Sequence, residues 1–286
     1  MPLFYFIDEV NNFIQRTLTG IIYVAVLLGA IFYDSLTFAL LFCVIVGLSL
    51  WEFYGLLKHF EDTALRRVVS TGAGMYLFVA SYLCASGFGT LFFLPYLLYI
   101  MYAFISELYT KAPNPIENWA YMLLGQIYCA GSFSLLNFIA IRPGLATHAP
   151  EYNLLFVLAL FVFIWLNDTG AFLVGSMIGK HRLFERISPK KSWEGFFGGM
   201  VFAMLASQVF AYIDSEIAWY NWLGLSVVIV IFGTWGDLVE SLLKRTLGVK
   251  DSGKILPGHG GMLDRFDSVM LAIPAAYMYI RLFIQN

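Results

Sequence analysis

The sequence predicts an all-α integral membrane protein with about nine transmembrane helices and a cytoplasmic N-terminus. Three observations support this fold class. The chain is 60% hydrophobic and 18% aromatic with a mean hydropathy of +0.75, its apolar residues gather in long runs, and its basic residues gather in a few loops. A soluble domain of 286 residues does not have this composition, because its surface needs more polar side chains.

Nine apolar runs are close to the length that a helix needs to cross about 30 Å of hydrocarbon. They cover roughly 17–33, 35–57, 68–87, 89–109, 119–141, 153–179, 196–213, 217–236 and 266–285. We divide the single membrane domain into a cytoplasmic lead-in at 1–16, five helices in 17–152 and four helices in 153–286. The first run lacks a small-residue cleavage site and continues into the second, so we expect no cleavable signal peptide.

The basic residues test this helix count, because cytoplasmic loops of membrane proteins carry an excess of Lys and Arg. With nine crossings and a cytoplasmic N-terminus, 15 of the 17 Lys and Arg residues fall on the cytoplasmic side. Arg142 is left on the other side, and Arg281 lies near the end of the last helix. One helix more or fewer between the loops at 180–191 and 244–265 would separate them across the membrane. We therefore predict that both loops share the cytoplasmic side.

A carboxylate lies inside the second apolar run, at Glu52. An unpaired carboxylate at the bilayer centre costs about 3 kcal/mol on insertion scales. Glu52 is close to the predicted cytoplasmic end of its helix, so we expect its side chain to snorkel to the interface. The alternative is a functional role within the membrane.

Asp168 lies deeper in its helix, about 16 Å from the cytoplasmic end at 1.5 Å per residue. A charge at that depth usually faces protein or a water-filled cavity and marks function. The alternative is a buried hydrogen-bonding residue that packs helices together, aided by Gly175 and Gly179. Both interpretations stay open on the sequence alone.

The first basic loop continues through Ser188-Pro-Lys-Lys-Ser-Trp-Glu-Gly195. Ser188 followed by Pro189 is a favourable N-cap and first-turn pair, so we expect the seventh helix to start there. The positive-inside rule alone would account for the charge of Lys190 and Lys191, but not for the serines, Trp and Glu beside them. We therefore predict that the loop binds phosphate groups.

The stretch from Gly236 to Asp267 concentrates charged residues in a chain that is 13% charged. Asp237, Glu240, Ser241 and Lys244 share one face of a helix by their spacing, and Asp264 and Asp267 share another. The Gly-rich loop between them brings backbone N–H groups close to an anion. Asp264-x-x-Asp267 is also compatible with a variant of the helix capping box. His259 is compatible with a base, a ligand or a hydrogen-bonding loop residue.

These motifs resemble the signature of the phosphatidate cytidylyltransferase (CDP-diacylglycerol synthase) family. The resemblance rests on Ser241-x-x-Lys-Arg245, Lys250-Asp251 and Pro257-x-His-Gly-Gly-x-x-Asp-Arg-x-Asp267, and extends to the Asp168-Thr pair and the loop that ends at Gly195. It implies an enzyme that joins CTP to phosphatidic acid and releases pyrophosphate. It also implies a multi-pass protein of the bacterial inner membrane with its active site on the cytoplasmic side of the C-terminal helices.

The resemblance assigns roles to individual residues. It implies catalytic roles for Asp168, Asp237, Lys244, Arg245, Asp264 and Asp267. It implies substrate binding by Ser188, Lys190, Lys191, Ser192, Ser241, Lys250, Asp251, His259, Gly260, Gly261 and Arg265. It implies Mg²⁺ on Asp237 and Asp264, with room for a second cation. The expected partners are CTP, phosphatidic acid, the lipid bilayer and a second copy of the chain, and they include no nucleic acid.

Two other functions compete with this interpretation. A CTP-dependent lipid-alcohol kinase, or a cytidylyltransferase for another lipid phosphate, would use similar residues, and a kinase would release CDP instead of pyrophosphate. An ion-coupled transporter would use Asp168 and Asp237 as an ion path, although transporters more often show interrupted helices in two matching halves.

Overall fold

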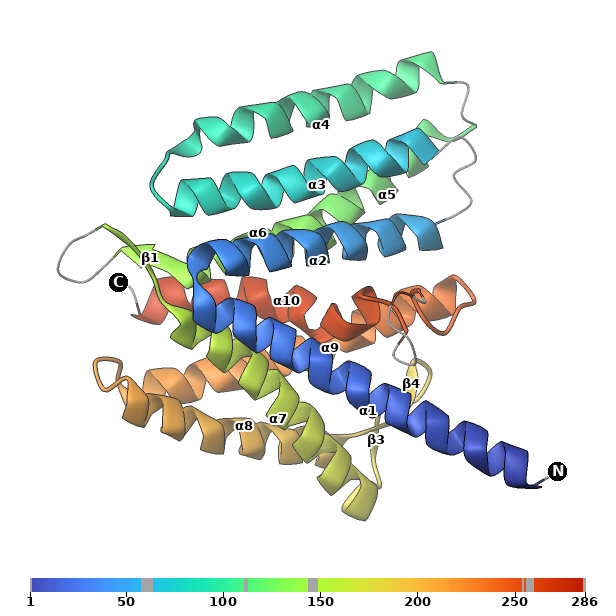
Figure 1. Cartoon of the computed structure of the whole chain (residues 1–286), viewed down its shortest axis with the longest axis vertical. Helices are drawn as coiled ribbons and strands as arrows, with labels where there is room; N and C mark the ends of the chain where they lie inside the picture. Colours follow the sequence, from blue (N-terminus) through green and yellow to red (C-terminus); the bar gives the residue numbers. More distant parts are fainter. Residues whose placement is uncertain are drawn as a thin grey trace.

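The computed structural model describes residues 2–57, 64–110, 113–143, 149–253, 255 and 260–284, with side chains described from residue 17 onward except at 64 and 65. Within these residues the chain is a bundle of helices with two short antiparallel hairpins, which lie at opposite ends of the bundle (Figure 1). The predicted all-α class is confirmed.

Helices α1 to α6 form the N-terminal half. Residues 2–16 of the predicted lead-in and the first apolar run form one continuous helix. Asp34 caps the next helix by accepting a hydrogen bond from the Leu36 amide at 3.3 Å. The elements are α1 Pro2–Tyr33, α2 Ser35–Leu56, α3 Ala64–Ala85, the short helix η1 Thr90–Phe93, α4 Leu94–Ser106, η2 Glu107–Tyr109, α5 Pro115–Gly125, the π-helical turn η3 Gln126–Gly131 and α6 Ser132–Ala140.

Helices α7 to α10 form the C-terminal half. Its elements are the hairpin β1 Ile141–Pro143 with β2 Pro150–Tyr152, α7 Leu154–Ile178, the hairpin β3 Arg182–Phe184 with β4 Ser188–Ser192, α8 Trp193–Ile213, α9 Trp219–Thr246, α10 Leu263–Tyr279 and the π-helical turn η4 Ile280–Ile284. α9 continues past the predicted end of its apolar run at 236, because the charged residues that follow are mostly good helix formers.

By length and hydropathy, eight helical segments within the described residues are able to cross a membrane, and Thr17–Tyr33 is a ninth, shorter apolar segment. The eight segments are Ser35–Leu56, Arg66–Ala85, Thr90–Tyr109, Pro115–Ala140, Leu154–Ile178, Trp193–Ile213, Trp219–Thr246 and Leu263–Ile284. These nine segments correspond to the nine predicted runs. The chain is a multi-pass membrane protein, and its orientation in the membrane stays a prediction.

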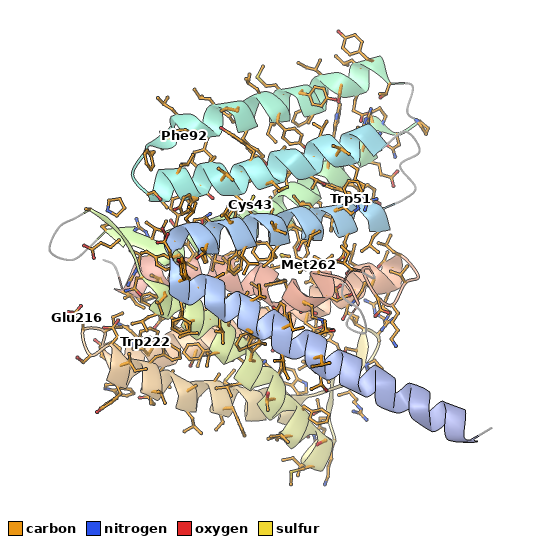
Figure 2. All side chains as sticks on the ribbon, viewed as in Figure 1. Cys43, Trp51, Phe92, Glu216, Trp222 and Met262 are labelled. Atoms are coloured by element: carbon orange, nitrogen blue, oxygen red, sulfur yellow. The ribbon has the colours of Figure 1, made fainter. Side chains whose placement is uncertain are left out.

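The two predicted basic loops lie at the same end of the bundle. Figure 1 shows the N-terminus, the β3–β4 hairpin and the start of α10 at one end, with the C-terminus and the β1–β2 hairpin at the other. Figure 2 shows the same division in its labelled side chains, with Trp51 towards the first end and Glu216 at the second. This arrangement agrees with an even number of crossings between the two basic loops.

Glycines allow α7 and α8 to pack closely along much of their length. A Cβ atom at Gly195 would lie 2.8 Å from the carbonyl oxygen of Ala171, and one at Gly199 would clash with Asn167. Gly175 faces Gly195 across the same interface. Gly175 therefore lies in a close helix interface, as the alternative interpretation expected, whereas the Asp168 side chain is exposed and not buried.

Four buried phenylalanines join the two halves of the molecule. Phe42 of α2, Phe133 of α6, Phe161 of α7 and Phe266 of α10 contact one another with ring centroids 5.5 to 6.5 Å apart. Each is at most 1% exposed. Since Phe266 lies between Asp264 and Asp267 in the sequence, this aromatic core fixes the position of the first turns of α10.

The predicted helix N-cap at Ser188 and Pro189 is wrong, although the seventh span itself agrees with α8. Residues 188–192 form strand β4 and pair with β3, so Ser188 and Pro189 do not begin a helix. α8 starts at Trp193, and the Ser192 hydroxyl caps it by accepting a hydrogen bond from the Gly195 amide at 3.1 Å. A Ser-Pro pair suits the beginning of a strand as well as a helix start, and the backbone pairing with β3 decides between them.

Candidate active site

The β3–β4 hairpin, α7 and α8 surround a hollow of about 470 Å³, with Thr234 of α9 at its wall. This volume is within the usual range of small-molecule sites, about 300 to 1,000 Å³. The polar residues that line it are Asn167, Asp168, Ser176, Arg182, Lys190, Lys191, Ser192 and Thr234. Apolar residues such as Phe172 and Phe196 complete the lining, so the hollow offers both cationic and apolar surfaces.

The hairpin is fastened to the start of α8 by His181 and Glu194. The Nδ1 atom of His181 lies 2.6 Å from Oε1 of Glu194, and the His181 amide donates to both carboxylate oxygens at 3.2 Å. The Trp193 amide donates to the carbonyl oxygen of His181 at 2.9 Å. These bonds hold Lys190 and Lys191 against the hollow.

One contact joins the β3–β4 hairpin to α9. The Lys191 ammonium lies 2.5 Å from Oδ2 of Asp237, and the Ser241 hydroxyl donates to the other oxygen of that carboxylate at 3.2 Å. Asp237 and Ser241 are one turn apart on α9, as their spacing predicts. Lys191 and Asp237 are each close to 30% exposed, so solutes are able to reach them.

Asp264 is the centre of a second set of contacts. Its Oδ1 atom accepts from the Lys244 ammonium at 2.7 Å, and its Oδ2 atom accepts from the Gly261 amide at 2.8 Å. The Ser252 amide donates to both oxygens, at 2.9 and 3.1 Å. Lys244 also lies 2.6 Å from Oε2 of Glu240. The predicted common face of α9 thus extends to Lys244 and meets the start of α10.

The capping-box interpretation of Asp264 and Asp267 is wrong. The residue that precedes α10 is Met262, and no side chain caps the helix there. Asp264 instead accepts hydrogen bonds from loop residues before the helix, and Oδ1 of Asp267 accepts from the adjacent Ser268 amide at 2.6 Å. Asp264 therefore organises the Gly-rich loop.

Five carboxylates lie near cationic side chains in this region. Asp267 interacts electrostatically with Asp237, Glu240 and Lys191, while Asp168 interacts with Lys191 and Asp237. The side chain of Asp168 is exposed, and it faces the hollow. The carboxylates are Asp168, Asp237, Glu240, Asp264 and Asp267, against the ammonium groups of Lys191 and Lys244. Arg182 and Lys190 also line the hollow, so the site offers carboxylate oxygens for a cation and basic groups for phosphates.

The chemistry of these donors fits a hard divalent cation. Among the described residues, no group of three Asp, Glu, His or Cys converges as a closed metal cage. Mg²⁺ does not need one, because proteins usually hold it with one or two carboxylates, water and substrate phosphates. Asp237 and Asp264, the predicted ligands, each already hold a lysine ammonium in contact with a carboxylate oxygen. Their carboxylate oxygens are suitable ligands for such an ion.

The remaining predicted residues lie around this centre. Ser192 caps α8 and lines the hollow, Lys190 is exposed at the hollow, and Ser188 is half-buried at the start of β4. Gly260 has a φ of +81°, a conformation that favours glycine, and Gly261 is buried. The exposed residues are Arg245, Lys250, Asp251 and Arg265. His259 lies outside the described residues.

Sequence reasoning missed two residues. Arg182 lines the hollow, and its place in β3 follows from a strand that the sequence did not predict. Glu52 does not snorkel to the interface, and that prediction is wrong. It is 5% exposed, and its Oε2 atom accepts hydrogen bonds from the Ser252 hydroxyl and the Leu263 amide. The position of Glu52 in an apolar run was the sequence signal that could have indicated its burial.

Known proteins of similar sequence identify the family of this chain. A family model described as "Cytidylyltransferase family" matches residues 14–283. The chain belongs to the cytidylyltransferase family. Two relatives match along nearly their whole length: one from Haemophilus influenzae is 32% identical over 93% of this chain and 98% of its own, and one from Bacillus subtilis is 33% identical over 94% and 98%.

A third relative, from Staphylococcus aureus strain COL, is 49% identical over 120 residues. That match spans about half the length of the relative, at 46%, and 42% of this chain. All three relatives are named phosphatidate cytidylyltransferase. The family predicted from the motifs at 188–195 and 241–267 is confirmed.

Proposed function

We propose that this member of the cytidylyltransferase family is a phosphatidate cytidylyltransferase, which transfers CMP from CTP to phosphatidic acid. The observation that carries the proposal is the contact between Lys191 and Asp237, which joins both motifs beside a hollow with cationic and apolar walls. Family membership and the shared name of its relatives support the same reaction. The products are CDP-diacylglycerol and pyrophosphate, and the product lipid serves phospholipid biosynthesis.

The reaction needs no nucleophile from the protein. A phosphate oxygen of phosphatidic acid forms a bond to the α-phosphorus of CTP, while the bond from that phosphorus to the oxygen that bridges to the β-phosphorus breaks. Pyrophosphate leaves with that oxygen and its electron pair. The barrier comes mainly from repulsion between two anions and from charge that develops on the leaving group. Lys190, Lys191 and Arg182 line the hollow and would reduce both.

The acidic residues complete the proposal. Asp237 and Asp264 would hold Mg²⁺, and the neighbouring carboxylates of Glu240 and Asp267 leave room for a second cation. The ion would neutralise charge on the phosphates of CTP. Lys244, Arg245, Lys250 and Arg265 would contact phosphate groups, and Asp168 would line the site from α7.

The walls of the hollow suggest how the two substrates arrive. Phe172 of α7, which lines the hollow, is 73% exposed, so an apolar surface extends from the hollow to the outside of the bundle. The acyl chains of the lipid would enter sideways between helices, while CTP would enter from the aqueous side at the hairpin. Such a site brings a water-soluble nucleotide and a membrane lipid to one place.

Product analysis tests the proposal. Purified protein is incubated with Mg²⁺, a panel of lipid phosphates and lipid alcohols, and CTP that carries label in the α-phosphate or in the γ-phosphate. The proposal predicts α-label in a lipid product and γ-label in pyrophosphate, with phosphatidic acid as the best acceptor. Release of CDP, with γ-label in the lipid, would identify a kinase and contradict the proposal.

We also propose that the N-terminus and both basic loops face the cytoplasm, in the bacterial inner membrane. In a cysteine-free background, Glu185→Cys and Lys250→Cys should resist an impermeant thiol reagent in intact cells, while Ser215→Cys should react. All three positions are exposed, so reactivity reports the side of the membrane. Labelling of Glu185→Cys and Lys250→Cys from opposite sides would contradict the shared site.

The family resemblance also implies a homodimer. Light scattering on the protein in detergent measures its mass, and a mass of one chain at working concentration would contradict this part of the proposal.

A further inference from the structure

A carboxylate from the N-terminal half reaches into the candidate active site. Glu52 lies near the end of α2, is 5% exposed, and forms no ion pair with a described Lys or Arg. A buried charge of this kind costs free energy unless hydrogen bonds compensate it. Its compensation comes from the C-terminal half, about 200 residues later in the chain.

Glu52 binds both ends of the Gly-rich part of the loop, which lies between Ser252 and Leu263. Its Oε2 atom accepts from the Ser252 hydroxyl at 3.1 Å, where the loop begins, and from the Leu263 amide at 2.9 Å, where α10 begins. Hydrogen bonds to a charged acceptor are roughly twice as strong as neutral ones. One carboxylate oxygen therefore fixes the distance between the two ends of the loop.

The same loop residues hold Asp264. The Ser252 amide donates to both oxygens of Asp264, and Asp264 pairs with Lys244. A continuous path of contacts leads from Glu52 through Ser252 to Asp264 and Lys244. Displacement of Ser252 would therefore displace the carboxylate that the proposed function assigns to the metal.

The loop backbone packs directly on the carboxylate. A Cβ atom at Gly253 would clash with Oε1 of Glu52, and a Cβ atom at Gly261 would clash with Oε2. The Gly261 amide donates to Asp264 at 2.8 Å, so the residue that touches Glu52 on one side orients Asp264 on the other. These two glycines allow the loop to approach Glu52 this closely.

We propose that Glu52 is a positioning residue for the active site, which ties Ser252 to Leu263 and thereby sets the position of Asp264 and Lys244. It acts through the loop and does not contact the substrates. The proposal rests on the proposed function only where it concerns turnover, since the loop geometry is measurable without substrates.

Two substitutions separate its hydrogen bonds from its charge. Glu52→Ala removes the acceptor for Ser252 and Leu263. Glu52→Gln keeps an acceptor oxygen, and its amide is able to occupy the place of Oε1, which has no hydrogen-bond partner among the described residues. Glu52→Ala should lower kcat about thirtyfold or more, while Glu52→Gln should stay within about threefold of the wild type, because the hydrogen bonds are what matters.

Hydrogen–deuterium exchange supplies a readout that does not depend on activity. Amides in the segment 250–264 of the full protein in detergent should exchange about tenfold faster in Glu52→Ala than in the wild type, and at nearly the wild-type rate in Glu52→Gln. The apparent Mg²⁺ requirement for turnover should rise in Glu52→Ala alone. If the wild type makes no CDP-diacylglycerol, the proposed function fails, and exchange still decides the role of Glu52.

Glu107 provides the matched control. It is also a carboxylate in the N-terminal half that is 5% exposed, but its contacts are Arg66, Thr110 and Asn118, away from the loop. Glu107→Gln should leave loop exchange, kcat and Mg²⁺ requirement unchanged.

The proposal would be overturned if Glu52→Ala kept the loop exchange rate and the kcat of the wild type. It would also be overturned if loop exchange were equally fast in Glu52→Ala and in the control Glu107→Gln. If Glu52→Ala does not fold, Ser252→Ala replaces it, because it removes one bond to Glu52 and keeps the amide that binds Asp264. Faster exchange in 250–264 of Ser252→Ala would support the proposal, and wild-type exchange there would overturn it.

Discussion

Two buried ion pairs, one in each half of the molecule, are chemically similar and differ in their surroundings. In the N-terminal half Arg66 pairs with Glu107, and their side chains are 19% and 3% exposed. In the C-terminal half Lys244 pairs with Asp264, and theirs are 13% and 7% exposed. Burial does not distinguish the two pairs, so burial alone does not identify the active site.

The neighbouring charges and the space beside them do distinguish the two pairs. Glu107 has one cationic partner and two neutral donors, Thr110 at 2.9 Å and Asn118 at 3.3 Å, and the cavity beside it is about 50 Å³. Asp264 belongs to a cluster of carboxylates that includes Asp237, whose partner Lys191 lines a hollow of about 470 Å³. Clustered charged groups beside an open volume mark a candidate functional site, whereas an isolated pair with neutral neighbours does not.

The largest expected loss of activity comes from substitution of Asp264. Asp264→Asn removes the charge that pairs with Lys244 and that would hold the metal, so activity should fall at least about a hundredfold and the Mg²⁺ requirement should rise. Initial rates across a Mg²⁺ series, on protein shown to be folded in detergent, provide the measurement. Near-normal activity with an unchanged Mg²⁺ requirement would end the metal assignment of Asp264, although not the family assignment.

A smaller effect is expected at the rim of the hollow. Replacing both Lys190 and Lys191 with Gln removes two cations that line it, so the KM for CTP should rise about tenfold, since phosphate contacts to charged groups are lost. Lys180→Gln with Arg186→Gln is the matched control, because it removes equal charge from exposed positions of the same loop that do not line the hollow. Equal kinetics in the two double variants would leave only a topological role for Lys190 and Lys191.

The smallest kinetic effect is expected at the other ion pair. Glu107→Gln should lower the free energy of unfolding by about 2 kcal/mol, because Arg66 loses its charged partner within a buried site. Its KM and kcat, measured well below the melting temperature, should match the wild type. A change in KM would show that the cavity beside Glu107 takes part in substrate binding and would remove the distinction between the two pairs.

The sequence predicted the parts of the site that depend on helix periodicity and on the number of crossings. The spacing of Asp237, Ser241 and Lys244 puts them on one helical face, and the distribution of Lys and Arg puts both basic loops at one end of the bundle. Both arguments are local or depend only on counting helices. They do not depend on how the helices pack.

The contacts that the sequence did not predict depend on how the helices and loops pack. The bond between Glu52 and Ser252 joins positions 200 residues apart, and the position of Glu52 in its apolar run gives no indication of which loop will approach it. Strand β4 was taken for a helix start because Ser188 and Pro189 suit both, and the partner strand β3 is what decides. The way in which α7, α8 and α9 pack around the hollow likewise depends on the assembled bundle.

A double-mutant cycle on Lys191 and Asp237 tests most directly whether the β3–β4 hairpin and α9 form one catalytic unit. Lys191→Gln, Asp237→Asn and the double variant are compared with the wild type by kcat/KM for CTP, with Glu107→Gln combined with Lys191→Gln as the control for independent sites. The account predicts that the double variant is little worse than the poorer single variant, because residues that act as one unit are not additive. In the control variant, Lys191→Gln with Glu107→Gln, the two losses of kcat/KM should multiply. If the losses also multiplied in Lys191→Gln with Asp237→Asn, the account would be contradicted.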